Sequence, residues 1–259
     1  MPSTEPGAAP AGRLAPSSGL SVYPVTGMGE VGPGDDLSSL LAAALEGAGD
    51  GAGVPGGLSE GDVLVVTQKV VSKAEGRLVA VDADDPGAKQ ALVEAESVRI
   101  VRRRGDLIIS ETRHGFICAN AGVDLSNVAA GTAALLPLDP DLSARRIRAA
   151  LGHRCGVSVG VVVSDTFGRT WRRGVTDVAI GVAGVAGIVD LRGTTDANGR
   201  ILDATEVCVA DELAGAAELV MGKDRGVPAA VVRGVDPRWL RPSSVATEIV
   251  RPPDEDLFR

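Results

Sequence analysis

The chain has 259 residues, with 26 Lys and Arg against 34 Asp and Glu, which leaves a formal net charge of −8. This acidic balance argues against a general nucleic-acid-binding protein, and at 2% Phe, Trp and Tyr are too scarce to build the stacking surfaces that hold single strands. Hydrophobic residues make up 44%, which excludes a chain disordered throughout and allows a sizeable core.

Cysteine and histidine counts limit the chemistry further. Three cysteines without a CxxC pair, and only two histidines, argue against a disulfide framework and against a zinc site built on Cys or His. Any metal would need oxygen ligands, which suit Mg²⁺ or Mn²⁺. No apolar stretch is long enough to span a bilayer and no secretion signal opens the chain, so we expect a cytoplasmic protein without a membrane partner.

The expected elements follow from hydrophobic patterns, helix caps and turn residues. Residues 1–18 and 246–259 are expected to be flexible tails around one folded region at 19–245, of one or two subdomains. Strands are expected at 21–26, 62–68, 107–112, 133–138, 158–164, 175–184, 188–192 and 229–234, and helices at 37–45, 87–101, 139–151 and 206–221. Without strict βαβ alternation, this order favours an α+β fold with mixed and antiparallel sheets and flanking helices.

The first candidate site is Gly27-Met-Gly-Glu-Val-Gly32, which follows a strand and matches the GxGxxG pattern of dinucleotide-binding sites. Pro33 and Gly34 come next, so no helix can begin inside the motif. Asp35 and Asp36 at the start of the following helix would repel a pyrophosphate. A dinucleotide site is therefore disfavoured, whereas a glycine-rich loop that touches some other ligand and a plain turn both stay open.

A second candidate is the segment Thr67-Gln-Lys-Val-Val-Ser-Lys73, which follows a hydrophobic strand. Lys69 and Lys73 lie at the end of that strand, where sites in α/β-type sheets gather, and two lysines can neutralise phosphate oxygens. A solvated loop fits the local sequence equally well. The sequence has no Walker A motif, because Gly222-Lys223 is followed by Asp and not by Ser or Thr.

Two further segments carry polar clusters. Between His114 and Asn127, polar side chains lie among small residues, which allow close approach of a ligand, and Asp124 is a candidate ligand for a hard cation. A turn with Asn and Asp caps explains the same pattern, and His114 is more typical of a structural or surface histidine than of a catalytic base.

The strongest local signal follows the buried strand that ends at Ser164. Asp165 and Thr166 together can hold a divalent metal, as strand-end Asp residues do in phosphoryl-transfer sites. Arg169, Arg172 and Arg173 follow within a few residues and can clamp phosphate or carboxylate groups. The alternative is a basic surface turn.

Together these segments carry a resemblance to a known family. GMGEVGPGDDL, VVTQKVVSKAEG, ETRHGFICANAGVDLSN and VSDTFGRTWRRG, followed by GIVDLRG and VMGKDRGVPAAVVRG, resemble the coenzyme F420:L-glutamate ligase family in the same order, over about Leu20 to Val235. The resemblance implies an α+β catalytic domain at 19–245, an intertwined homodimer and no P-loop. It also implies a GTP-dependent ligase that adds L-glutamate through amide bonds to the deazaflavin precursor coenzyme F420-0.

The resemblance also implies roles for individual residues. Asp124 and Asp165 would bind one divalent metal, Mg²⁺ or Mn²⁺, and Thr166 a second one, with K⁺ as a further candidate ion. Asp124, Asp165, Arg169 and Arg172 are the expected catalytic residues. The expected contacts to GTP are Met28, Gly29, Glu30, Val31, Gln68, Lys69, Lys73, Asn127, Met221, Gly222, Lys223, Asp224, Arg225, Gly226 and Val227. Some members have Gln where this chain has Lys223, whose own charge would then replace that of a second metal.

The chemistry implied by the family suits these residues. A carboxylate is a poor electrophile, and transfer of the γ-phosphoryl group of GTP would convert it to an acyl phosphate that the amine of glutamate attacks. Two other functions stay open on the sequence. One is a dinucleotide-dependent oxidoreductase that uses the GMGEVG loop, and the other is a non-catalytic deazaflavin-binding protein with the same fold.

Overall fold

The computed structural model describes residues 19–47, 53–82, 84–85 and 87–258, so the tail expected at 1–18 lies outside the described residues. A five-stranded sheet in the order β1-β12-β2-β8-β9 forms its centre. These strands are β1 (Ser21–Pro24), β12 (Ala229–Arg233), β2 (Val63–Thr67), β8 (Gly160–Arg169) and β9 (Arg172–Ala183). The pair β2 and β8 runs parallel, and the other neighbouring pairs run antiparallel.

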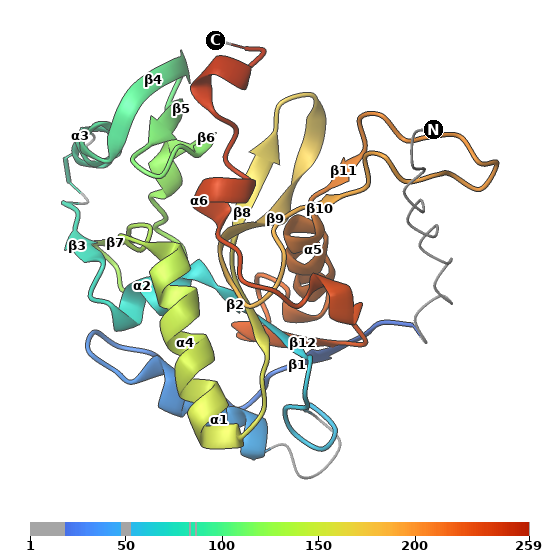
Figure 1. The fold of residues 1–259 in the computed structure, drawn as a ribbon. Coiled ribbons are helices and arrows are strands. Elements are labelled where there is room, and N and C mark those ends of the chain that lie inside the picture. The colour runs from blue at the N-terminus through green and yellow to red at the C-terminus, as the bar shows by residue number, and fades with distance from the viewer. Residues whose placement is uncertain (1–18, 48–52, 83, 86, 259) are drawn as a thin grey trace, which may run out of the picture.

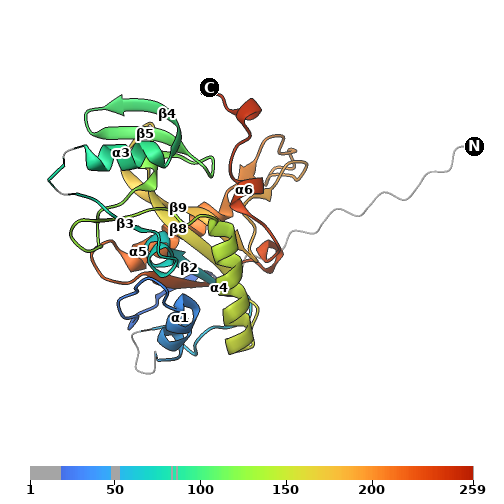
Figure 2. The same ribbon diagram turned by 90° about the vertical axis from the view of Figure 1, so that its left-hand side faces the viewer.

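Helices cover both faces of this sheet (Figures 1 and 2). α5 (Val209–Met221) crosses one face and contacts β9, β12 and β1, whereas α4 (Pro140–Cys155) lies against β8 and β9 on the other face with α1 (Leu37–Glu46) beside it. Cover on both faces explains why β2 reads as an unbroken apolar run: all of Val63–Val66 are fully buried. The buried strand predicted there is confirmed.

Three small sheets and a second hydrophobic cluster complete the fold. β4 (Ser97–Arg104), β5 (Leu107–Thr112) and β6 (Ile117–Ala119) form an antiparallel sheet, and two-stranded sheets pair β3 (Leu78–Ala80) with β7 (Thr132–Ala134) and β10 (Val189–Asp190) with β11 (Glu206–Val207). Val93, Ile108 and Leu135 belong to the second cluster, under α3 (Ala88–Ala95). The predicted α+β class is confirmed. None of the described helices is long and apolar enough to cross a membrane.

Two predicted helix starts are confirmed by their caps. Asp36 precedes α1, and its carboxylate accepts a hydrogen bond from the backbone N–H of Ser39 at 3.1 Å. Asp139 precedes α4, and its carboxylate accepts one from the backbone N–H of Leu142 at 2.8 Å, with Pro140 in the first turn.

Several expected boundaries are wrong. The helix expected at 87–101 ends at Ala95, and Ser97–Arg104 forms β4, because Gly105 reverses the chain and lets this segment pair with β5 from Ser97 opposite Thr112 to Arg104 opposite Leu107. Gln68, expected as the end of the strand at 62–68, and residues 69–73, expected outside regular structure, belong to α2 (Gln68–Ala74). The helix expected from 206 begins at Val209.

Other boundaries differ in length. The strand expected at 158–164 continues to Arg169, the strand expected at 133–138 shrinks to β7, and the one expected at 188–192 shrinks to β10. Near the C-terminus, α6 (Val245–Glu248) begins where the second tail was expected, and the buried carboxylate of Asp141 accepts hydrogen bonds from the backbone N–H groups of Val245 and Ala246.

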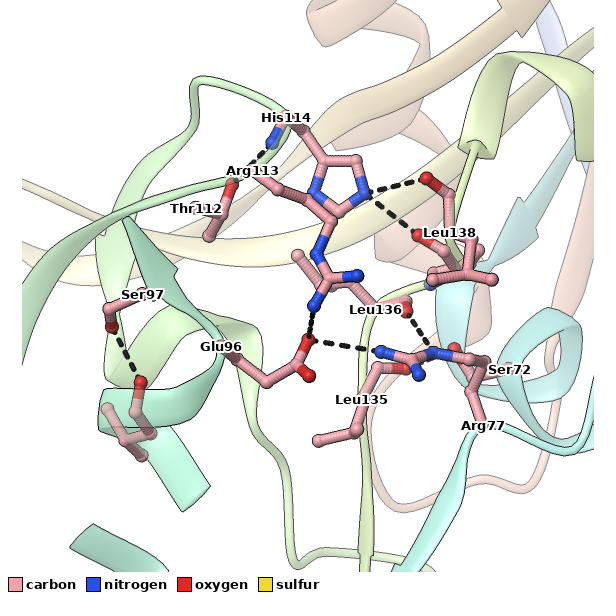
Figure 3. Close-up of polar contacts among 12 residues, drawn as sticks. Ser72, Arg77, Glu96, Ser97, Thr112, Arg113, His114, Leu135, Leu136 and Leu138 are labelled. Atoms are coloured by element: carbon pink, nitrogen blue, oxygen red, sulfur yellow. Dashed lines mark hydrogen bonds and ion pairs between the residues drawn. The ribbon is translucent and has the colours of Figure 1, made fainter. Parts of the chain in front are cut away.

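A polar network joins α2 and the segment after it to the three-stranded sheet (Figure 3). The carboxylate of Glu96 accepts hydrogen bonds from both Arg77 and Arg113 at 3.0 Å, and Arg77 also donates to the carbonyl of Leu136. Nε2 of His114 lies 2.9 Å from the carbonyl oxygen of Pro137. This network holds the polar segment that follows His114 in place beside α2.

Candidate functional site

Four segments that are far apart in the sequence meet at one edge of the central sheet. Because β2 and β8 are parallel with Thr67 opposite Ser164, the residues that follow both strands emerge at the same edge. β12 runs the other way, and the backbone N–H of Thr67 bonds to the carbonyl of Pro228 at 2.9 Å, so the residues before β12 also lie there. The N–H of Val25 bonds to the carbonyl of Ala229, which brings in the loop after β1.

A cavity of about 400 Å³ opens where these segments meet, a size typical of a small-molecule site. The three expected metal-binding residues, Asp124, Asp165 and Thr166, line it, as do all of the expected nucleotide-binding residues except Met221 and Arg225. Met221 is buried in the core. Arg169 and Arg172 do not line the cavity and lie on the exposed end of the β8–β9 hairpin.

Lys69 ties α2 to the segment that carries Asp124. Its Nζ lies 2.7 Å from the Asp124 carboxylate and donates to the backbone carbonyl of Ser126 at 2.6 Å and to its hydroxyl at 2.7 Å. Burial alone would raise the pKa of Asp124, but hydrogen bonds from Lys69 and Ser126 hold it below its ordinary value. Asp124 is therefore a carboxylate at neutral pH and is held in a fixed position.

The same segment is tied to the loop before β12. Asn127 has a φ of +52°, in the left-handed region that Asn tolerates better than most residues. Its side-chain amide donates to the backbone carbonyl of Lys223 at 3.5 Å. This conformation brings the loop residues around Lys223 to the cavity wall.

Lys73 is a second cation in the cavity wall. Its side chain is only 10% exposed, and its ammonium forms an ion pair with Glu30, whose side chain is 85% exposed. The ammonium is therefore largely buried on α2, whereas its partner Glu30 is exposed at the edge of the cavity. An anionic ligand in the cavity can therefore replace Glu30 as the partner of Lys73.

Asp165, Thr166 and Asp177 form the acidic part of the site. Loss of hydration raises the pKa of Asp165 to about 7, and the charges of Asp177 and Asp124 act in the same direction, against the lowering effects of the backbone N–H of Thr166 and the charge of Lys223. Asp177, 3% exposed, accepts hydrogen bonds from the hydroxyls of Thr166 at 2.6 Å and Ser164 at 3.0 Å.

Asp177, Ser164, Ser126 and Glu218 line the cavity but were not among the predicted site residues, although Ser126 was noted in a polar cluster. The sequence does carry a signal for Asp177, because a charged residue interrupts the apolar run of β9. Burial, and next the charge of Asp177, raises the pKa of Glu218, which lies one turn before the end of α5. Acidic side chains and lysines thus lie next to one another in the cavity wall, with Lys69 beside Asp124 and Lys73 beside Glu30.

The donor set fits a hard divalent cation. Within the described ranges, no three His, Cys, Asp or Glu side chains form a ready-made metal cluster. The available donors are the carboxylates of Asp124 and Asp165 and the hydroxyl of Thr166. Because the hydroxyl of Thr166 donates its hydrogen bond to Asp177, its oxygen lone pairs remain available to a cation. An all-oxygen set suits Mg²⁺ or Mn²⁺, and a cation would offset the repulsion that raises the pKa of Asp165.

The GxGxxG loop does not form a dinucleotide site. α1 begins at Leu37, after Gly32 and a turn at Pro33 and Gly34, so no helix N-terminus opens within the motif. Met28, Gly29 and Glu30 line the cavity as an irregular loop instead. Of the readings left open for this segment, the structure supports a loop that borders a ligand cavity.

Comparison with known proteins finds similar sequences over most of the chain. Residues 27–234 match the family described as F420-0:Gamma-glutamyl ligase. The chain is 44% identical to a coenzyme F420:L-glutamate ligase from Methanothermobacter thermautotrophicus, over 93% of this chain and 99% of that protein. It is also 44% identical to the protein of that name from Methanopyrus kandleri, over 93% and 98%, and 37% identical to that from Archaeoglobus fulgidus, over 93% and 96%.

Proposed function

Because the chain belongs to the F420-0:gamma-glutamyl ligase family of coenzyme F420 biosynthesis, we propose that it is a GTP-dependent ligase that joins L-glutamate to coenzyme F420-0. The observation that carries the proposal is the convergence of Lys69, Lys73 and Lys223 with Asp124 and Asp165 in one cavity. The lysines can bind the phosphate oxygens of a nucleotide, and the carboxylates can bind the divalent cation that accompanies them, in the same cavity.

Two of the three lysines would bind the nucleotide directly. Lys73 would exchange Glu30 for a phosphate oxygen, and Lys223 would bind a second phosphate oxygen from the loop before β12. Lys69 is already bound to Asp124, so its role is to position that carboxylate. These contacts orient the γ-phosphoryl group without a P-loop.

Asp124, Asp165 and Thr166 would hold Mg²⁺ or Mn²⁺, with K⁺ as an additional candidate. When bound, the divalent cation neutralises charge on the transferring phosphoryl group. The carboxylate of F420-0 attacks the γ-phosphorus and GDP leaves, which gives an acyl phosphate. The amine of glutamate then attacks the acyl carbon, inorganic phosphate leaves, and the amine proton passes to solvent. Asp177 keeps the Thr166 hydroxyl in position throughout.

Reconstitution tests the proposal directly. The purified protein is incubated with F420-0, L-glutamate, GTP and Mg²⁺ or Mn²⁺, with and without K⁺, and the products are weighed by mass spectrometry. We expect F420-0 to gain glutamyl residues in step with GDP and phosphate release, and to remain unchanged when GTP or glutamate is omitted. Modification supported equally by ATP would contradict the GTP dependence, and no modification with any nucleotide would contradict the ligase.

We also propose that the protein is a homodimer, on the basis of its family resemblance alone. Sedimentation equilibrium at micromolar concentration measures this property independently of activity. A single species at the monomer mass of 26.3 kDa would contradict it.

A further inference from the structure

The β8–β9 hairpin extends past the sheet that supports it. β8 pairs with β2 only as far as Ser164, and from Asp165 onward the described parts of β8 and β9 pair only with each other. In Figure 1 this yellow ribbon rises beyond the helix layers. Thr170 and Trp171 form its turn, and Trp171 is 83% exposed. A tryptophan so placed adds nothing to the core.

The same turn carries an unbalanced positive charge. Arg169, Arg172 and Arg173 are all exposed, and in the described part of the chain no carboxylate lies within ion-pair distance of any of them. Arg169 and Arg172 lie directly opposite each other in the strand register, and like charges in that position destabilise a hairpin. An anionic ligand would relieve this repulsion.

The turn of the hairpin is connected to the cavity along β8. Asp165 and Thr166, which line the cavity, are on the same strand as Arg169, and three strand residues span about 10 Å. A ligand of about that length can therefore touch the cavity with one end and the turn with the other. Three consecutive single bonds in an extended chain span at most about 3.6 Å, so a ligand needs about eight bonds between its two ends to cover the distance from the cavity to the turn.

We propose that the hairpin turn binds the acceptor, with Trp171 stacked on its aromatic ring and Arg169 and Arg172 on its phosphate. This inference rests on the proposed function, because it assigns the acceptor of that reaction to a place. An acceptor with an aromatic ring, a phosphate and a reacting carboxylate has groups that match, in this order, Trp171, the arginines of the turn and the cavity. Indole faces stack on flat heteroaromatic rings, and guanidinium groups bind phosphate through paired hydrogen bonds.

A second copy of the chain is the competing occupant of the turn. Two hairpins that met at their turns would bring their arginines together without a counter-charge, which favours the small anionic ligand. The oligomeric state of Trp171→Ala separates the two cases. Removal of Trp171 should weaken the dimer only if the turn contacts a second copy of the chain.

The test uses Trp171→Ala and Trp171→Phe in the full chain, with Phe258→Ala as the matched control for loss of an exposed aromatic side chain. Arg172→Ala is paired with Arg146→Ala, an exposed arginine on α4. F420-0 is titrated into each protein and its binding is followed by deazaflavin fluorescence. Initial rates with varied F420-0, GTP and glutamate then give a KM for each substrate and kcat.

We expect Trp171→Ala and Arg172→Ala each to weaken F420-0 binding and raise its KM about tenfold. In Trp171→Ala, the kcat at saturation and the KM values for GTP and glutamate should stay within about twofold. Trp171→Phe should recover most of the affinity, and both controls should match the parent.

Unchanged affinity for F420-0 in Trp171→Ala would overturn the proposal. So would a shift from dimer to monomer in Trp171→Ala with an unchanged KM for F420-0, which would assign the turn to an interface. If the parent binds F420-0 but forms no product, the proposed function fails, while the loss of binding in Trp171→Ala still supports this inference.

Discussion

The ion pair between Lys73 and Glu30 leads to two substitutions with opposite expected effects on nucleotide binding. The Lys73 ammonium lies in the cavity wall and pairs with the exposed carboxylate of Glu30, which a phosphate oxygen of the proposed nucleotide would replace. Lys73→Met removes the cation that the phosphate needs. Glu30→Gln removes only the competitor, so it should leave the cation available.

The magnitudes follow from the burial of the two side chains. A hydrogen bond from an ammonium to a charged group contributes about 1.5–3 kcal/mol, so Lys73→Met should weaken GTP binding by about tenfold to a hundredfold. Glu30 is 85% exposed, and exposed ion pairs contribute at most about 1 kcal/mol, so Glu30→Gln should tighten binding by at most about fivefold.

Isothermal titration of GTP and of ATP, each with Mg²⁺, into the parent and both variants measures these effects. An ammonium that faces phosphate does not read the base, so Lys73→Met should weaken GTP and ATP equally. Lys89→Met is the matched control, because Lys89 lies on α3 and does not line the cavity. Unchanged affinity in Lys73→Met, or weaker binding in Glu30→Gln, would refute the reasoning.

Three further predictions concern charge and stability. Asp165→Asn should abolish metal-dependent turnover yet raise the melting temperature in EDTA above pH 7. The folded-state pKa of Asp165, about 7, exceeds its ordinary value of 3.8, so ionised Asp165 destabilises the fold and the gain should shrink toward pH 4. Asp141→Ala should cost about 3–5 kcal/mol in urea unfolding, because buried backbone N–H groups of Val182 and Val245 lose their acceptor; a cost below 1 kcal/mol would contradict this. Burial lowers the pKa of His114, so as the pH falls below about 6.5 the unfolded chain is protonated at His114 before the folded chain is, and the fold loses stability. His114→Gln should therefore reduce the fall in melting temperature on acidification. An unchanged slope of melting temperature against pH would show that His114 is not its cause.

Local rules were sufficient where a residue acts on its own neighbours. Asp36 and Asp139 cap helices through backbone groups three residues away, and such interactions can be read directly from the sequence. The buried β2 could be predicted for the same reason, since its apolar run is continuous. Lys69 and Lys73 were predicted to lie at a site because they follow the end of that strand, and both residues line the cavity.

Pairing with distant segments was the part that local sequence could not supply. Val98 and Ile100 continue the apolar pattern of α3 closely enough to predict one long helix, and only the pairing of Ser97–Arg104 with β5, in which Ile100 lies opposite Ser110, makes this segment a strand. Asp177 is a comparable case. It meets Thr166 because of the β8–β9 register, which shifts by one residue after Val163 at a bulge that no local pattern announces.

That register also explains how the site is formed before any ligand arrives. The carboxylates of Asp165 and Asp177 are on strands whose buried valines fix the pairing, and a slip of one residue would turn each side chain to the opposite face. Lys69 is held to the same edge through β2. The contacts that join the separate segments, Lys69 to Asp124 and Lys73 to Glu30, are ionic. In the proposed reaction a phosphate would replace Glu30 beside Lys73, whereas Lys69 would keep Asp124 in position. The cavity therefore has the required charges in place while the apolar core supplies their spacing.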